Sequence, residues 1–284
     1  MSETVTLSES PLPAARPVTP STILAEELGE LVQQFGAAPG VDRTLLDRLR
    51  RARDLAAGLD PYLSECTTPE SHALAELARR TRETDWSADR AAGVRLEQEM
   101  LSGHVEGQVL KFLLHLSRAT HVLEIGMFTG YSALAMAEEL SDDGSLTACE
   151  IDAEVAAFAR QSLDASPAGK RITIEVGPAL DTLRRLSARL GSTGDRFDFV
   201  FIDADKPGYL DYLDYLLESS LLAPRAVIAV DNTLMQGQPY ADGELSTNGA
   251  AIAGFNAALT LDPRVEQVLL PLRDGLTLIR RATR

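Results

Sequence analysis

The stretch HVLEIGMFTGYSALAMAEEL, residues 121–140, changes pattern halfway along its length. HVLEI is a short apolar run typical of a buried strand, whereas YSALAMAEEL has its apolar residues at helical spacing. Gly126 and Gly130 bracket the turn between them, and glycine lets the backbone approach a neighbour or a ligand closely. A plain strand-to-helix turn would explain the glycines equally well. Either way, the stretch predicts one strand–turn–helix unit of an α/β fold.

The same alternation continues along the chain. Further strand-like runs are SLTACE (145–150), RITIEV (171–176), FDFVFID (197–203) and AVIAVDN (226–232), and helical segments lie between them at 153–163, 179–190 and 209–220. This order predicts right-handed crossovers and a parallel sheet with helices on both faces. After one more helical stretch, VEQVLLPL and LTLIRR are separated by Arg-Asp-Gly. That spacing predicts an antiparallel hairpin at the C-terminal edge.

The N-terminal third has a different composition. Residues 1–19 are rich in Ser, Thr and Pro, which predicts a disordered or loosely docked arm. Residues 20–100 are predicted to be helical, with Ser21 as a possible cap, a second helix ending near Gly58, and a third with Pro69 in its first turn. Because apolar helix faces must be buried, this region is predicted to be a lid, a dimerisation region or both. The α/β domain is predicted at 101–284.

Charge and composition exclude some classes of function. The chain has 284 residues, a formal net charge of −15 and a pI of about 4.7, which argues against nonspecific binding to nucleic acid or to an anionic membrane. No apolar run approaches the roughly 18 residues of a membrane span, and no signal peptide is visible. Cys66 and Cys149 lie far apart and predict no disulfide framework. The expected location is the cytoplasm.

Acidic residues mark a nucleoside site. Ligands of open α/β sheets bind beyond the carboxyl ends of the strands, where strand order reverses. Glu124 lies in the first strand and Glu150 ends the second, where an acid can accept both hydroxyls of a ribose. Asp152 is interpreted as a helix cap. Ala179 leaves room for an adenine, although a simple helix start explains it too. The Gly-x-x-x-Gly spacing disfavours a dinucleotide, so an NAD-dependent oxidoreductase is the weaker reading.

A second group of polar residues follows the next two strands. Asp203, Asp205 and Lys206 follow the fourth strand, and Asp231–Asn232 end the fifth. Neighbouring strands lie about 5 Å apart, so Asp203, Asp231 and Asn232 can converge as oxygen ligands for a divalent cation such as Mg²⁺. A helix cap, a turn, and a Lys206–Asp205 salt bridge are the structural alternatives.

Histidine gives no clear metal signal. His104 precedes a helical segment and has no partner of known ligand spacing. Whether it lines the pocket stays open.

Several motifs in order resemble the cation-dependent, class I S-adenosyl-L-methionine (SAM) O-methyltransferases, the group of the caffeoyl-CoA and catechol enzymes. They are DPYLSECTTPE (60–70), MLSGHVEGQ (100–108), LEIGMFTGYSALAMA (123–137), FDFVFIDADKPGYLDY (197–212) and VDNTLMQG (230–237). The resemblance implies a Rossmann-like fold with a seven-stranded, mostly parallel sheet, an antiparallel C-terminal hairpin and an N-terminal helical cap. It also implies roles for single residues. SAM would contact Ser102, Glu124, Gly126, Met127, Ser132, Glu150, Ala179 and Asp203; the metal would bind Asp203, Asp231 and Asn232; Lys206 would be the general base, with Asp203 in the catalytic group; and Asp205 would touch substrate. Glu150 departs from the Asp that plant relatives commonly carry.

A closer resemblance covers RPVTPSTILAEEL (16–28), LAAGLDPYLSECTTPES (55–71) and VEQVLLPLRDGLTLIRR (265–281). These stretches are similar to the O-methyltransferases of mycosporine-like amino acid biosynthesis, which make 4-deoxygadusol from its demethyl precursor. The implied substrate is a small cyclohexenone whose adjacent oxygens can chelate a cation, and the implied assembly is a homodimer. A phenolic O-methyltransferase and a non-catalytic SAM- and metal-binding module are the alternatives.

Overall fold

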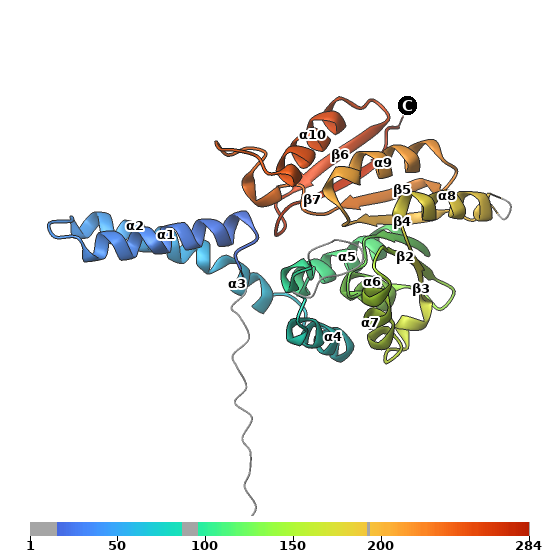
Figure 1. Ribbon diagram of the computed structural model, residues 1–284, viewed down its shortest axis with the longest axis horizontal. Helices are drawn as coiled ribbons and strands as arrows, with labels where there is room; N and C mark the ends of the chain where they lie inside the picture. Colours follow the sequence, from blue (N-terminus) through green and yellow to red (C-terminus); the bar gives the residue numbers. More distant parts are fainter. Residues whose placement is uncertain (1–15, 87–95, 192–193, 284) are drawn as a thin grey trace, which may run out of the picture.

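The computed structural model describes residues 16–86, 96–191 and 194–283 (Figure 1). Most of the predicted arm, residues 1–15, lies outside these ranges, as does the 87–95 part of the predicted helical region. Within the described residues, no helix combines the length and apolarity needed to cross a membrane.

One seven-stranded sheet runs through the molecule in the order β3-β2-β1-β4-β5-β7-β6. Strands β1 to β5 pair in parallel, and β7 pairs antiparallel with β5 and β6. The mostly parallel sheet and its C-terminal hairpin are therefore confirmed. The strands are β1 (His121–Ile125), β2 (Ser145–Glu150), β3 (Ile172–Val176), β4 (Phe197–Ile202), β5 (Leu222–Val230), β6 (Val265–Leu270) and β7 (Leu276–Arg281).

Helices cover both faces of the sheet. Side chains of α4, α5 and α6 form one buried cluster, and side chains of α8, α9 and α10 form the other. The strands between them are apolar on both sides, as expected for a parallel sheet covered on both faces. The helices are α1 (Pro20–Ala37), α2 (Arg43–Ala57), α3 (Leu59–Glu65), α4 (His72–Glu83), α5 (His104–Ser117), α6 (Tyr131–Glu139), α7 (Ala153–Leu163), α8 (Ala179–Leu190), α9 (Tyr209–Glu218) and α10 (Thr247–Leu261).

Two predicted helix starts are wrong. The first helix is capped by Thr19, whose side chain accepts a hydrogen bond from the Thr22 backbone N–H, and Ser21 lies inside it. The helix after Pro69 begins later, because Ser71 accepts from Leu74 N–H and caps α4. In both cases the cap is the residue whose hydroxyl reaches a free N–H of the first turn.

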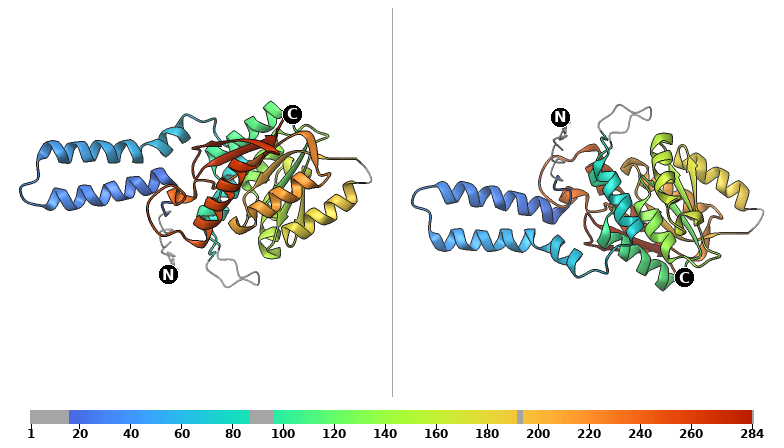
Figure 2. Two further views of the ribbon diagram at one scale, coloured as in Figure 1. Left: turned by 90° about the horizontal axis from the view of Figure 1, so that it is seen from above. Right: turned by 90° about the horizontal axis from the view of Figure 1, so that it is seen from below.

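Helices α1 and α2 form a hairpin that extends away from the rest of the molecule (Figures 1 and 2). Val32 is the only buried residue of α1, and α2 has no buried residue. The predicted end of α2 is confirmed, with Gly58 at the C-cap. The short helix α3 follows directly and was not predicted. The division into a helical region and a catalytic domain stays a prediction.

Strand order reverses between β1 and β4, and their carboxyl ends approach closely there. Gly126 has φ +90°, and a Cβ on it would lie 2.1 Å from the Asp203 carbonyl oxygen. The close approach of the backbone that follows β4 therefore explains why a residue without a side chain is needed here. Helix-bearing crossovers leave β1 and β4 in opposite directions, which opens the sheet edge where ligands of such folds bind.

Candidate active site

A cavity of about 540 Å³ lies at the carboxyl end of the sheet. This is within the usual range for small-molecule sites. The predicted site residues that line it are Ser102, Gly126, Glu150, Ala179, Asp203, Asp205, Lys206, Asp231 and Asn232. Three others, Glu124, Met127 and Ser132, are buried but do not line it. The strands therefore bring most of the predicted set into one space.

Glu150 lies at the end of β2 and is held by the backbone. Its two carboxylate oxygens accept hydrogen bonds from Phe128 N–H at 2.8 Å and from Asp152 N–H at 2.9 Å. Burial raises the pKa of Glu150 above its ordinary value, against the lowering effect of these hydrogen bonds. The carboxylate is thereby fixed in orientation at the cavity wall, as a ribose-binding acid needs to be. Asp152 caps α7, as predicted.

Glu124, in β1, is a fully buried acid. Its Oε1 accepts a hydrogen bond from Ser132, while Oε2 has no partner among the described residues. Burial raises the pKa of Glu124 well above its ordinary value. An unpaired buried oxygen is costly. Because Glu124 does not line the cavity, its predicted contact with SAM stays a prediction.

Asp203, Asp231 and Asn232 follow adjacent strands, β4 and β5, and line the cavity together. Burial and the neighbouring Asp203 carboxylate raise the pKa of Asp231 to about 7. Asn232 has φ +58°, a left-handed conformation that asparagine adopts more readily than most residues other than glycine. Two repelling carboxylates beside an amide oxygen are a donor set that fits a hard divalent cation.

The three predicted metal ligands include only two carboxylates. Over the described parts of the chain, no group of three or more His, Cys, Asp or Glu side chains is arranged to hold a metal. A cation held here would therefore need further oxygens from substrate or water, as Mg²⁺ sites commonly have.

Lys206 pairs with Asp203, not with Asp205. Its ammonium donates to Asp203 Oδ1 at 2.9 Å and to the Tyr209 hydroxyl at 2.7 Å. Tyr209 in turn donates to the Asp231 backbone oxygen, so it holds Lys206 between the ends of β4 and β5. The Lys206–Asp205 salt bridge considered from the sequence is absent from the ion pairs of the described residues.

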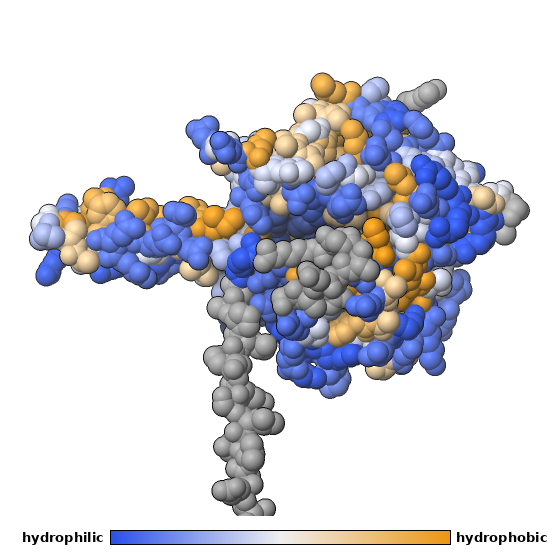
Figure 3. All heavy atoms as spheres, viewed as in Figure 1, coloured by the Kyte–Doolittle hydropathy of each residue, from blue (hydrophilic) through white to orange (hydrophobic). Residues whose placement is uncertain are grey.

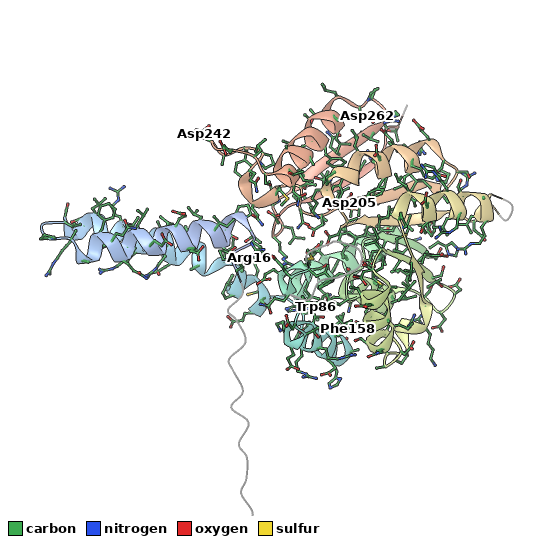
Figure 4. The ribbon with its side chains drawn as sticks, in the orientation of Figure 1. Arg16, Trp86, Phe158, Asp205, Asp242 and Asp262 are labelled. Atoms are coloured by element: carbon green, nitrogen blue, oxygen red, sulfur yellow. The ribbon has the colours of Figure 1, made fainter. Side chains whose placement is uncertain are left out.

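Asp205, labelled in Figure 4, accepts a hydrogen bond from the Tyr212 hydroxyl, and both residues line the cavity. His104 does not line it. Its ring contacts Ser64 and the Thr68 carbonyl beside a smaller hollow. Its position ties α5 to the segment that follows α3.

Sequence reasoning missed a charged pair in the cavity wall. Arg273, in the turn between β6 and β7, donates to Glu106 of α5 at 3.1 Å. The only sequence signals were an acid within an apolar helix and an arginine beside the Asp-Gly of the hairpin. Arg16 was missed as well; it pairs with Glu97 and, through its backbone N–H, with Glu99. Figure 4 shows Arg16 at the base of the α1–α2 hairpin.

Comparisons with known proteins agree with this architecture. The sequence profile of the O-methyltransferase family matches residues 65–282. A caffeoyl-CoA O-methyltransferase of Petroselinum crispum is 36% identical over 219 residues, which are 75% of this chain and 85% of that protein. Caffeoyl-CoA O-methyltransferase 1 of Eucalyptus globulus is 39% identical over 62% of this chain and 72% of its own length.

Solved structures share the fold. The SAH-bound methyltransferase PaMTH1 of Podospora anserina has a TM-score of 0.67 and 27% identity, covering 81% of this chain and 96% of its own. The SAM complex of the O-methyltransferase TomG of Streptomyces achromogenes has a TM-score of 0.66 and 29% identity, covering 80% and 96%. With its profile match, its curated relatives and this Rossmann-like sheet, the chain belongs to the O-methyltransferase family.

Proposed function

We propose that this protein is a SAM- and divalent-cation-dependent O-methyltransferase acting on a vicinal enediol of a small cyclic substrate. The specific candidate is conversion of demethyl-4-deoxygadusol to 4-deoxygadusol in mycosporine-like amino acid biosynthesis. One observation carries the reaction class: a cavity that combines the ribose-type acid Glu150 with the oxygen cluster of Asp203, Asp231 and Asn232. SAH and SAM in the related structures support the cofactor.

Each residue has a role in this proposal. Glu150 would bind the ribose, Glu124 would contact SAM as the family resemblance implies, and Ala179 would border the adenine. Asp203, Asp231 and Asn232 would hold the cation, which when bound lowers the pKa of a chelated hydroxyl. Lys206, anchored by Asp203 and Tyr209, would accept the proton of the hydroxyl that is methylated; for this it must be the neutral amine, the form that a bound cation nearby would favour.

The choice of substrate has support from the cavity wall. Two of the stretches that carry the closer resemblance contribute to it: Arg16, Val18 and Thr19 from one, and Arg273 and Asp274 from the other. The cavity wall thus includes residues from two of the three stretches that resemble the mycosporine-type enzymes. A phenolic substrate of the catechol or caffeoyl-CoA type is the second candidate, because the curated relatives above carry that name.

Mass spectrometry tests the proposal. The protein with SAM and Mg²⁺ should add one methyl group to the demethyl cyclohexenone, and EDTA should abolish the transfer. Asp203→Ala should do the same while SAH still raises the melting temperature. Methylation of catechols alone would exclude the mycosporine assignment, and full activity of Asp203→Ala in EDTA would exclude the metal.

A further inference from the structure

The turn between β6 and β7 reaches the catalytic edge of the sheet. Strand β7 runs antiparallel to β5, and Val230 at the carboxyl end of β5 pairs with Thr277 near the start of β7. The residues just before β7 therefore lie beside those that follow β5. Asp231 is flanked on one side by Lys206, after β4, and on the other by Arg273, before β7. Both cations oppose the rise in the pKa of Asp231 that burial and Asp203 cause, consistent with this arrangement.

This turn is held firmly in place. Leu234 N–H donates to the Asp274 carbonyl at 2.8 Å, and Gln236 N–H donates to the Asp274 carboxylate at 2.6 Å. Gly275 has φ +93°, and a Cβ on it would lie 2.6 Å from Leu234. The turn thus packs directly against the loop that follows the predicted metal ligands, which fixes where Arg273 can reach.

Arg273 occupies a strained position in that turn. The turn is closed by Gly275 N–H donating to Leu272 O at 2.7 Å, and Arg273 has φ +49°. A positive φ at the first central residue of such a hairpin turn is normally supplied by glycine. An arginine there costs backbone energy, and such strain is typical of functional sites. What the arginine adds is a guanidinium in the cavity wall.

One nitrogen of that guanidinium already donates hydrogen bonds within the protein. Its Nη1 donates to the Leu101 carbonyl at 3.2 Å and to Glu106 Oε2 at 3.1 Å. Glu106 is buried, 1% exposed, and its Oε1 has no partner among the described residues. By accepting these hydrogen bonds, Glu106 and Leu101 fix the orientation of the guanidinium plane.

The other edge of the guanidinium is available. Nε and Nη2 of Arg273 have no hydrogen-bond partner in the described part of the chain. The side chain keeps 28% of its surface exposed, and Arg273 lines both the cavity and the smaller hollow beside it. This Nε–Nη2 edge presents two parallel N–H donors, the geometry that binds a carboxylate or a pair of neighbouring anionic oxygens.

We propose that Arg273, mounted on Glu106, is an anion-binding subsite that selects acidic substrates over neutral diols. The inference rests on the proposed function for its reaction and narrows the substrate class. An enol conjugated to a ring ketone is a vinylogous carboxylic acid, so the proposed cyclohexenone carries a shared negative charge. Arg273 binds the anionic oxygen at one end of this conjugated system, while the vicinal pair at the other end faces Asp203, Asp231 and Asn232.

Calorimetry on the protein loaded with SAH and Mg²⁺ tests the subsite without turnover. The probes are the demethyl cyclohexenone, 3,4-dihydroxybenzoate as a carboxylate-bearing diol, and catechol as a neutral one. The variant is Arg273→Gln combined with Glu106→Gln, which avoids leaving Glu106 as an unpaired buried charge. Arg280→Gln, on the same hairpin but in an exposed pair with Glu266, is the matched control.

The double variant should weaken binding of both acidic probes at least about tenfold, as expected for loss of a charge-assisted hydrogen-bond pair. Its affinity for SAH and for catechol should change less than about threefold, within the scatter of surface substitutions. The single variant Arg273→Lys should keep part of the affinity for the acidic probes that the double variant loses. Equal loss for catechol, or unchanged affinity for the acidic probes, overturns the inference.

The two proposals fail separately. If the wild-type enzyme methylates the cyclohexenone and the double variant binds it equally well, the subsite is wrong and the function stands. If the wild-type enzyme methylates only catechols, the proposed substrate is wrong, and the subsite is judged by the preference for 3,4-dihydroxybenzoate over catechol.

Discussion

Individual carboxyl groups in the cavity wall ionise less readily than they do in water. Asp274 shows this clearly: burial raises its pKa from 3.8 to about 6. As pH rises from 4 to 6, the unfolded chain releases this proton while the folded protein retains it. The raised pKa therefore makes the protein less stable as pH increases through that window, and the loss persists above it.

Asp274→Asn should remove this loss. The amide oxygen can still accept the hydrogen bond from Gln236 N–H. Relative to wild type, the variant should gain stability near pH 7 compared with pH 4, by at most about 3 kcal/mol at 1.36 kcal/mol per pKa unit. Urea unfolding at the two pH values measures the difference. Asp262→Asn is the opposite control. Arg264 lowers the pKa of Asp262, so the wild-type protein gains stability from this carboxylate as pH rises. The variant lacks that gain and should become less stable relative to wild type.

Lys206 offers a second residue-scale prediction. If it is the general base, Lys206→Met should lower kcat by about 10²- to 10⁴-fold. Lys206→Arg should be nearly as inactive, because a guanidinium keeps the ion pair with Asp203 but does not accept a proton at neutral pH. Both variants should bind SAH like wild type in calorimetry. An active Lys206→Arg enzyme would mean that Lys206 is needed only for its charge.

At the scale of elements, Gly126 determines how closely the backbone segments that follow β1 and β4 can approach each other. Gly126→Ala would place a Cβ 2.1 Å from the Asp203 carbonyl oxygen at φ +90°. The backbone that carries Asp203 must then move, so unfolding free energy should fall by about 3 kcal/mol or more, with loss of SAH binding.

Gly254 provides the control for that substitution. It lies within α10, and a Cβ there would meet no atom within 4 Å. Gly254→Ala should therefore stabilise the protein by up to about 1 kcal/mol through helix propensity. Chemical denaturation of both variants checks the pair, and a Gly126→Ala protein as stable as wild type would contradict the close-approach explanation.

Elements were predictable where the pattern itself determines them. The apolar runs at 121–125 and 145–150 are β1 and β2 without any shift, since a strand buried on both faces must be apolar throughout. Helix starts were less predictable, because Ser21, Thr19, Pro69 and Ser71 are all plausible starts and only the three-dimensional reach of a hydroxyl selects one.

The site was predictable for a related reason. Acids at strand ends converge once the sheet is parallel, so Asp203, Asp231 and Asn232 could be grouped from sequence. The Arg273–Glu106 pair joins residues 167 positions apart. Its contact depends on how the hairpin packs against α5, which no local pattern encodes.

At the scale of the whole molecule, the α1–α2 hairpin has too little core of its own. Leu24, Phe35, Leu45 and Leu55 are 53%, 45%, 54% and 81% exposed, and Figure 3 shows apolar surface along the hairpin. Isolated helices of this length are marginal in water. Such a surface on a projecting element is typical of an interface.

Charge indicates what covers the hairpin. Helix α1 carries Glu26, Glu27 and Glu30 and no basic residue, whereas α2 carries five arginines and two aspartates. Among the described residues, the ion pairs of α2 are internal to that helix. A two-fold axis would set α1 of one copy against α2 of the other, which makes the surface complementary to itself. We therefore propose a homodimer built on this hairpin.

Analytical ultracentrifugation tests the assembly. The wild-type protein should sediment as a dimer, with weaker association in high salt because the complementary charges are screened. Leu24→Glu combined with Leu55→Glu should give a folded monomer, since both side chains are exposed within one copy and their replacement leaves the cores around the sheet intact. Leu261→Glu, at an equally exposed site on α10 with 82% exposure, should remain dimeric. A monomeric wild-type protein would exclude the homodimer, and a dimer that survives the double substitution would place the interface elsewhere.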